Sequence, residues 1–463
     1  MRVSVGVLAG CGALLVAAPA LADQPPPRTL AEALGAAYSN NPTLLAERAH
    51  LRAVDENVPT ALAGWRPTVV LQAAPGYAVG TIQQTGSPSQ NNQRDILTLE
   101  ATLTQPIYRG GKTKAQTSQA ENSVMAERAR LIANEQQVFS DTINAYVTVI
   151  EDQQLLALAV NNVQVLAKQL QATNDRFRVG EITRTDVAQA EAALAGAQAQ
   201  RDTAEGNLQT ARAMFRQQVG VLPDQLLEPQ PLALPIRTAQ DANQLASVNN
   251  PNVVAALFDD AAQKDAIDVQ YAALMPTVSV VTTGFQENNT TLVHSRENGG
   301  EVTANITVPL FQGGSEYAAV RQARQTEQQS RKTLDAARRA AVQLATSSWE
   351  TLIAARATVD STRAQIRANE IALEGVEREA LVGSRTTLDV LNAEQALLSS
   401  RVTLVQNLAA LVNASYQVAA AIGRLTARDL GLRVPLYDET AYYNAVRNRW
   451  IGTGDYARGQ PGR

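Results

Sequence analysis

The chain contains two pairs of segments in which apolar and polar residues alternate with a period of two. The pattern is clearest in residues 94–107 and 301–311, where Thr, Glu and Asn separate the apolar positions. Those positions are Leu97, Leu99, Ala101 and Leu103 in the first segment, and Val302, Ala304, Ile306 and Val308 in the second. Because successive side chains of a strand point to opposite faces of a sheet, the pattern predicts strands with one apolar and one polar face at about 66–79, 94–107, 275–286 and 301–311.

Most of the remaining sequence is typical of helices. Each half of the chain is predicted to have an opening helix, a long helix and a returning helix, at about 28–64, 112–177 and 186–219, and then at about 241–273, 315–380 and 388–422. Prolines 42 and 59 interrupt the first opening helix. The long helices contain no proline and would each extend roughly 100 Å at about 1.5 Å per residue. Gly180 and Gly383 end them, and Thr185 and Thr387 are the predicted start signals of the returning helices.

The two halves are copies of one unit. Asn40-Asn41-Pro42 recurs 209 residues later, at Asn249-Asn250-Pro251. Three later landmarks recur at a spacing of 203 residues: Pro106 with Gly110-Gly111 and Pro309 with Gly313-Gly314, Val179-Gly180 and Val382-Gly383, and Gly220 and Gly423. An internal duplication in fixed register predicts a helix-strand-strand-helix-helix unit in residues 23–240 and again in 241–438. The polar residues 439–463 are expected to form a flexible tail.

The N-terminus predicts export. A basic start, an apolar run and Ala20-Leu21-Ala22 are typical of a signal peptide cleaved after residue 22. The alternative is lipidation of Cys11, because Leu8-Ala9-Gly10-Cys11 resembles a lipobox. After residue 22 the sequence has no apolar run of the roughly 18–20 residues that a membrane-spanning helix requires.

Composition narrows the function. The net charge is −4, which argues against a nucleic-acid partner. Cys11 is the only cysteine, and the two histidines, His50 and His294, have neither a metal-site spacing nor a triad partner. The sequence therefore predicts no enzyme activity, no metal and no cofactor. Because an open sheet edge is not tolerated in lipid and four strands cannot close a membrane barrel, two or more chains are expected to share one barrel.

The ordered motifs resemble those of the TolC family of outer-membrane efflux and secretion ducts. They are Asn-Asn-Pro with Arg66-Pro67-Thr68, the Pro-x-x-x-Gly-Gly strand exits, Arg178-Val179-Gly180 with Thr185-Asp186-Val187, and the run from Val382 to Ala393. The resemblance covers nearly the whole mature chain. It implies a mainly α-helical homotrimer in the outer membrane, with a shared twelve-stranded β-barrel continuous with a long periplasmic helical tunnel. The implied partners are a periplasmic adaptor and an inner-membrane transporter of the RND, ABC or MFS type.

The resemblance also implies a gate at the periplasmic mouth. By motif position, Arg385 would link to Thr185 and Asp186 of the other repeat, and Asp389 would belong to an acidic ring. The turns Val179-Gly180 and Val382-Gly383 would contact the adaptor. Asn392 replaces the second acid of the ring and Leu381 the usual aromatic residue, so a less negative mouth and a weaker latch are expected.

From the residues alone, the favoured interpretation of Asp186 and Asp389 is that of ordinary helix-start acids with no gating role, and only the resemblance favours the gate. An exported coiled-coil structural or adhesion protein would explain the helices but not the strands, and a diffusion porin would explain the strands but not helices of roughly 100 Å. The polar positions of the strands specify no cargo. The sequence does not distinguish between drugs, small metabolites and exported proteins as cargo.

Overall fold

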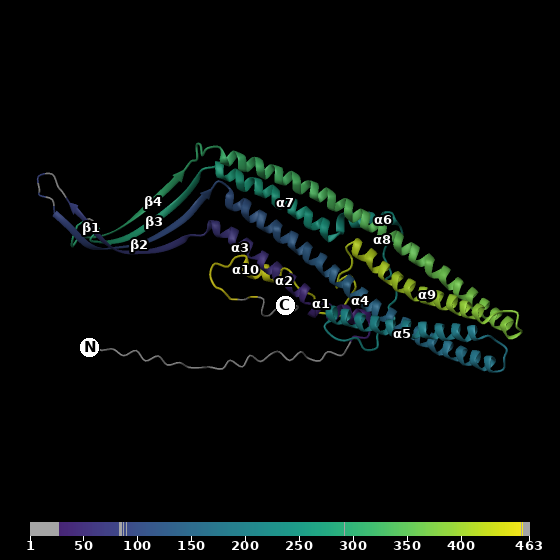
Figure 1. Cartoon of the computed structure of the whole chain (residues 1–463). Coiled ribbons are helices and arrows are strands. Elements are labelled where there is room, and N and C mark those ends of the chain that lie inside the picture. Colours follow the sequence, from purple (N-terminus) through teal and green to yellow (C-terminus); the bar gives the residue numbers. More distant parts are fainter. Residues whose placement is uncertain are drawn as a thin grey trace, which may run out of the picture.

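The chain folds into an elongated molecule with a β-sheet at one end and long helices extending from it (Figure 1). The computed structural model describes residues 27–82, 86, 88, 90–290, 292–454 and 456. The predicted signal peptide and Cys11 lie outside these residues. Within the described part of the chain, no helix is both long and apolar enough to cross a membrane.

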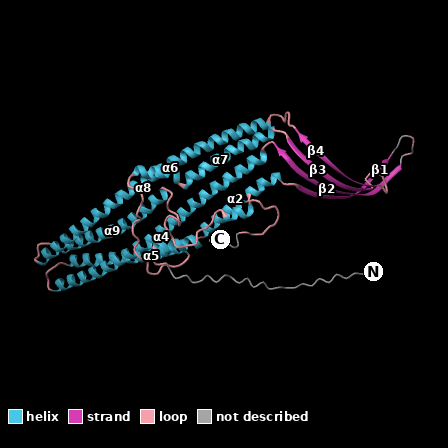
Figure 2. Cartoon of the chain, turned by 180° about the vertical axis from the view of Figure 1, so that it is seen from behind, coloured by secondary structure: helices cyan, strands magenta, loops and turns pink. Residues whose placement is uncertain are grey.

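The sheet has four antiparallel strands in sequence order, β1 (Thr68–Ile82), β2 (Gln90–Arg109), β3 (Thr277–Asn288) and β4 (Arg296–Thr307). Figure 2 shows it as a single curved layer that continues into the helices. The sequence placed β4 at 301–311, whereas the strand ends at Thr307. Pro309 has no N–H to donate and cannot continue a strand ladder, so the residues before Gly313 form a loop.

Two helices of 67 residues leave the sheet, α4 (Lys112–Arg178) and α8 (Ser315–Leu381). At about 1.5 Å per residue each is roughly 100 Å long. The returning helices are α5 (Arg184–Val219) and α9 (Thr387–Ala421), and they pack antiparallel along α4 and α8.

The opening segments are broken helices. The first predicted helix, at 28–64, is divided into α1 (Leu30–Asn40), α2 (Pro42–Asp55), α3 (Asn57–Leu62) and a 3-10 turn (Ala63–Trp65). The second, at 241–273, is divided into α6 (Ala239–Asn249), α7 (Pro251–Tyr271) and a 3-10 turn (Ala272–Leu274). The Asn-Pro pair explains the breaks between α1 and α2 and between α6 and α7, because each proline lacks the N–H that a continuous helix would need at that position. The interruption predicted at Pro59 is not found there, since Pro59 lies in the first turn of α3, and the chain instead breaks at Glu56.

The same asparagines join the opening helices to the returning helices. Asn41 and Asn250 start α2 and α7, each accepting a backbone N–H through its side chain. The Asn41 amide also donates to the Gln218 carbonyl at 3.1 Å, and the Asn250 amide to the Ala421 carbonyl at 3.1 Å. These bonds hold the end of each returning helix against an opening helix, so that the two stack and together run alongside one long helix.

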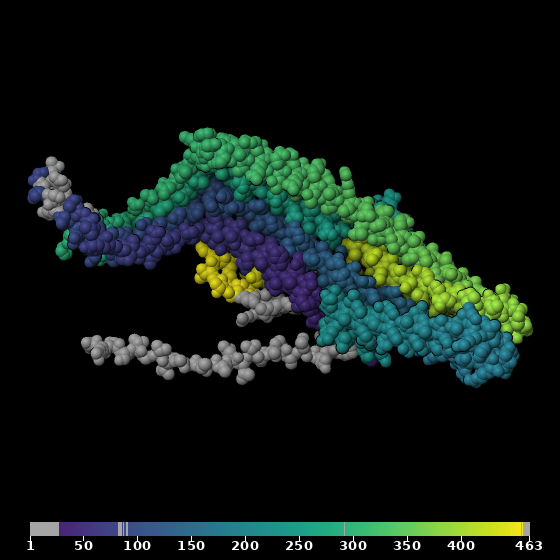
Figure 3. All heavy atoms as spheres, in the orientation of Figure 1, coloured from purple at the N-terminus to yellow at the C-terminus, as the bar shows by residue number. Residues whose placement is uncertain are grey.

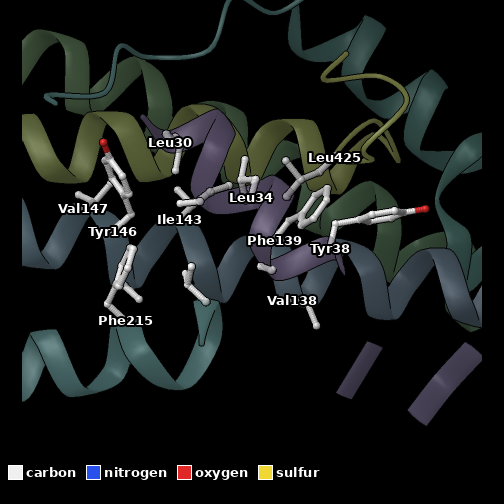
Figure 4. Packing of buried hydrophobic residues seen from close by; sticks show 14 of the residues in the cluster. Leu30, Leu34, Tyr38, Val138, Phe139, Ile143, Tyr146, Val147, Phe215 and Leu425 are labelled. Carbon is white, nitrogen blue, oxygen red and sulfur yellow. The ribbon is translucent and has the colours of Figure 1, made fainter. Parts of the chain in front are cut away.

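The main core lies where these helix ends meet. Figure 4 shows Tyr38 beside Phe139 and Tyr146 beside Phe215, with Leu34 and Ile143 between them. The Tyr146 hydroxyl lies 2.7 Å from the Leu227 carbonyl oxygen, which ties an irregular segment to this core. Burial of large apolar side chains here, at roughly 1.5–3 kcal/mol each, fixes the middle of the molecule.

The C-terminal region differs from the predicted flexible tail in its described part. Residues 437–451, here called the strap, contain a short helix, α10 (Ala441–Val446), and pack along α2 and α4. Val446 is buried, and Arg447 pairs with Glu121 of α4 at 2.8 Å. The composition of the segment is polar, but Tyr443 packs against a small apolar cluster from α3 and α4 that only the folded chain brings together.

Candidate functional site

The register of the sheet gathers the apolar residues of all four strands on one face. Val69 of β1 lies opposite Leu103 of β2, and Val280 of β3 opposite Ala304 of β4. Directly opposite residues share a face, so the alternation in each strand is in phase with its neighbours. The apolar face comprises Val69, Leu71, Ala73, Leu99, Ala101, Leu103, Val278, Val280, Val302, Ala304 and Ile306, with Gln105 and Thr282 in the same rows.

The opposite face is mostly polar. It includes Gln72, Glu100, Thr102, Thr283, Glu301 and Asn305. On the apolar face Leu71 is 75% exposed and Val302 is 71% exposed. A single chain therefore leaves a broad apolar surface uncovered, which is the property of a sheet with lipid on one side and water on the other.

Glycine pairs connect the sheet to the long helices. Gly110 and Gly111 follow β2, and Gly313 and Gly314 precede α8, all with φ between 63° and 86°. This left-handed region disfavours other residues. A Cβ on Gly110 would lie 2.6 Å from the carbonyl oxygen of Ala272, so this junction also needs glycine for close approach. Pro106 lies at a register shift in β2, at the start of the same exit.

The other end of the molecule consists of two similar turns, here called the tip turns. Val179 and Val382 are strongly exposed, and Gly180 and Gly383 have φ of 80° and 79°. In both turns two backbone N–H groups bond back to the last turn of the long helix, Gly180 to Phe177 and Gly383 to Ala380 among them. These bonds satisfy helix-end carbonyls and leave the valines at the surface.

The returning helices start with capping boxes. The hydroxyls of Thr183 and Thr386 accept the backbone N–H groups of Asp186 and Asp389, and each aspartate carboxylate accepts the backbone N–H of its threonine. The predicted start signals were Thr185 and Thr387, but both already lie within the returning helices. The Thr-x-x-Asp spacing of a capping box was the signal that could have identified the caps.

The hydrogen bonds of the capping boxes set the charge state of the two aspartates. Bonds from the Thr183 hydroxyl and backbone lower the pKa of Asp186, and bonds from the Thr386 backbone and hydroxyl lower that of Asp389, where Arg385 adds a smaller electrostatic effect. Both carboxylates are therefore charged at neutral pH and have their bonds satisfied locally.

Arg385 is in contact with its own hairpin. Within the described residues of one chain, its ion pair is with Glu379, at 2.8 Å, and both side chains are about half exposed. The expected link to Thr185 and Asp186 would have to form across hairpins. Glu379 was not expected from the sequence, since it precedes Arg385 by six residues on the other side of a turn. Asn392 is exposed one turn beyond Asp389.

Comparison with known proteins agrees with this architecture. A family model described as outer membrane efflux protein matches residues 33–221 and 242–424, one copy in each repeat. The outer membrane efflux protein BepC of Brucella suis is 34% identical over 425 residues, covering 92% of this chain and 91% of the relative. The outer membrane protein TolC of Escherichia coli is 24% identical, over 84% of this chain and 81% of the relative.

A solved structure has the same fold. The outer membrane protein VceC from Vibrio cholerae superposes with a TM-score of 0.75 at 20% identity, covering 85% of this chain and 96% of that chain. The predicted fold class, the outer-membrane location and the function as an efflux or secretion exit duct are confirmed. The chain belongs to the outer membrane efflux protein family.

Proposed function

We propose that three copies of this chain enclose one duct that conducts small molecules from an inner-membrane transporter, through a periplasmic adaptor, across the outer membrane. The observation that carries the proposal is the four-stranded sheet with one apolar face, joined directly to helices of roughly 100 Å. The sheet would form a third of a twelve-stranded barrel, and the helices a third of the wall of a periplasmic tunnel.

The free edges of the sheet support sharing between chains. β1 and β4 each pair on one side only. Unpaired backbone groups in lipid cost several kcal/mol each, so the edges require partner strands. Pairing β4 of one copy with β1 of the next satisfies both edges and continues the apolar face around a closed wall.

Small-molecule efflux is the first candidate for cargo because the Brucella relative at 34% identity is named an efflux protein. Protein secretion is the alternative. The transporter would be of the RND or MFS type in the first case and of the ABC type in the second. In either case the exposed Val179 and Val382 of the tip turns, with Gly180 and Gly383, are the proposed adaptor contacts.

A deletion strain tests the duct and its cargo together. Loss of the gene is expected to increase drug sensitivity, whereas loss of a secreted protein with unchanged drug sensitivity would favour secretion.

Leu71→Asp, on the apolar face, should fail to restore function because a charge there meets lipid, at a cost of roughly 2–4 kcal/mol for basic residues and less for acids. Asn305→Asp, on the polar face of β4 opposite Ser279, is the control and should restore it. Equal complementation by both variants contradicts the membrane orientation.

We further propose that Arg385 restrains opening by pairing with Asp186 and Thr185 of a neighbouring hairpin in the assembled duct. The charge and exposure of Arg385 support this, although Glu379 competes for it. Arg385→Ser is expected to raise single-channel conductance in planar bilayers. Arg378→Ser removes another exposed ion pair nearby, with Glu374, and is the control. An Arg385→Ser channel no leakier than this control rules the restraint out.

Asp389 is proposed to line the constriction, where three copies would place three carboxylates around one axis. Such a ring should bind multivalent cations and be blocked by them. With Asn392 in place of a second acid, the block is expected to depend on Asp389 alone. Cation block that is unchanged in Asp389→Ala would exclude the ring.

A further inference from the structure

The strap extends from the core to the end of the sheet. It begins at Tyr437, whose ring lies 5.2 Å from the buried guanidinium of Arg48. It continues through Tyr443, beside Arg128 and Glu121 of α4. In Figure 3 it forms a yellow mass against the purple N-terminal helices, close to the bend where the helices meet the sheet.

The strap is attached to this bend through Arg66. Arg66, two residues before β1, donates to the Arg449 carbonyl oxygen at 2.6 Å, and its guanidinium lies 5.2 Å from the centroid of the Trp450 ring. The adjacent Trp65 is held to the sheet, because the Gln105 side chain of β2 donates to its carbonyl at 3.0 Å. Two residues separated by 383 positions in sequence are thereby fixed at the point where the strands end.

The apolar side chains at this point are uncovered. Trp450 is 65% exposed and Ile451 is 87% exposed, and Trp65 is partly exposed beside them. An exposed Trp-Ile pair costs free energy in water, at roughly 25 cal/mol per Å² of apolar surface. The contact of the Arg66 guanidinium with the Trp450 ring favours the observed orientation of this side chain.

We propose that Trp450 and Ile451, with Trp65 and Arg66, form a membrane-interface anchor by which the strap attaches the helical part of the duct to the periplasmic-side lipid. The inference rests on the proposed placement of the sheet in the outer membrane. Indole rings favour the headgroup level, where the ring body is in an apolar layer and the N–H is in a polar one. The Arg66 guanidinium lies at the same level and would face lipid phosphates.

Lipid fits this position better than the two other neighbours that a duct offers. The end of the sheet borders the edge of the membrane, and exposed Val69 of the apolar face begins three residues after Arg66. A water-filled lumen would leave Trp450 and Ile451 hydrated. A second copy packed here would have to bury the Arg66 guanidinium, and among the described residues no acidic side chain of this surface pairs with it.

The three tryptophans make a direct test possible. Trp65, Trp349 and Trp450 are the complete set, so pairs of Trp→Phe substitutions leave one reporter in each full-length variant. The variants are reconstituted into vesicles of phosphatidylcholine with and without bromine on the upper acyl chain, and quenching of indole emission is measured. Trp450 and Trp65 are expected to be quenched to similar fractions. Trp349, in helix α8, should be unaffected.

The outcomes separate the anchor from the duct. Quenching of Trp65 but not of Trp450 overturns the anchoring of the strap and leaves the sheet in the membrane. No quenching of either also overturns the anchor, and Leu71→Trp, on the apolar face of β1 in a variant without the other tryptophans, then reports separately whether the sheet lies in the membrane. If Trp450 resists the brominated lipid but is quenched by aqueous acrylamide, it faces water. If it resists both, it lies against another copy. If a double variant fails to fold, the wild type is compared with the single variant Trp450→Phe. The part of the emission that brominated lipid quenches in the wild type but not in Trp450→Phe then comes from Trp450.

Discussion

Gly220 and Gly423 occupy equivalent places after the returning helices, but their surroundings differ. Both have positive φ, 92° and 79°. A Cβ on Gly423 would lie 2.3 Å from the Asn249 carbonyl oxygen, whereas a Cβ on Gly220 would meet nothing within 4 Å. The backbone conformation is therefore the same in both repeats, but only Gly423 lies against the backbone of a neighbouring segment.

Gly423→Ala is expected to destabilise the helical part by more than about 2 kcal/mol, because conformational strain and a backbone collision add. Gly220→Ala should cost only about 1 kcal/mol, from the left-handed conformation alone. Urea unfolding followed by circular dichroism in detergent measures both. Equal destabilisation would mean that the contact with Asn249 is relaxed at no cost.

Asp55 is a buried acid under the strap. Its side chain is fully buried, and neither carboxylate oxygen has a hydrogen-bond partner among the described residues. Burial raises its pKa to about 7, against the attraction of Arg128 and Arg52, while Glu56 and Glu439 add repulsion. In the folded state the protonated form is therefore favoured below about pH 7.

The pH dependence has a definite sign. The folded-state pKa lies above the ordinary value of 3.8, so the stability associated with Asp55 is fully present below that value and is lost as the pH rises through about 7. Asp55→Asn should flatten the stability curve in this window and stabilise the fold at higher pH, by a few kcal/mol at most. Asp224→Asn, at an exposed position, is the matched control. A slope that survives in Asp55→Asn assigns the titration to another group.

At the scale of elements, the helix hairpins are defined by their ends. Gly180 and Gly383 close the long helices, and the capping boxes at Thr183 and Thr386 open the returning ones. The long helices start at Gly111 and Gly314 without a side-chain cap. Among the four helices of the two hairpins, side-chain caps are therefore found only at the starts of α5 and α9 in the tip turns, where the proposed gate residues lie in the first turn of a helix.

Thr183→Ala is expected to destabilise the start of α5 by about 1 kcal/mol, because the cap accepts an otherwise unpaired helix N–H. Amide hydrogen exchange in the first turn of α5 should accelerate about fivefold. Thr185→Ala, which leaves the cap intact, is the control. If the two variants exchange alike, Thr183 is not the functional cap.

At the scale of the whole molecule, the open edges of the sheet are the main consequence of the fold. The chain ends its sheet with β1 on one side and β4 on the other, and both carry unpaired backbone groups. Because of these edges and the uncovered apolar face, a single chain cannot form a closed barrel. Closure of the barrel requires the assembled copies.

Engineered cysteines can count the copies. With Cys11 within the predicted leader, cysteines placed at residues 68–71 of β1 and 304–307 of β4 should cross-link only between neighbouring copies. A closed ring of three is expected to give bands of one, two and three chains on a denaturing gel and none larger. A cysteine at Thr102, in central β2, combined with one in β4 is the control. A fourth band would exclude the trimer.

Much of this architecture follows from short patterns in the sequence. Period-two alternation, proline-free helical stretches and paired glycines each act over a few residues, so the order of elements and the duplication could be predicted from the chain itself. The approximate ends of α4 and α8 followed because Gly111, Gly180, Gly314 and Gly383 stand beside them. The break at Pro42 was predicted but the one at Pro251 was not, since an Asn-Pro pair can either kink a helix or begin a new one.

What the tertiary structure decided depends on residues far apart in sequence. The ordering of the strap and the attachment of Arg449 and Trp450 to Arg66 are contacts that no local pattern encodes. The pairing of Arg385 with Glu379 spans only six residues, but it depends on the conformation of the tip turn between them. The register across β2 and β3 likewise joins the two repeats and creates one apolar face from four separate alternations. The sequence determined which faces are apolar, because side-chain direction follows from strand period; only the fold decided which of them lie together, because alignment requires the strands to meet.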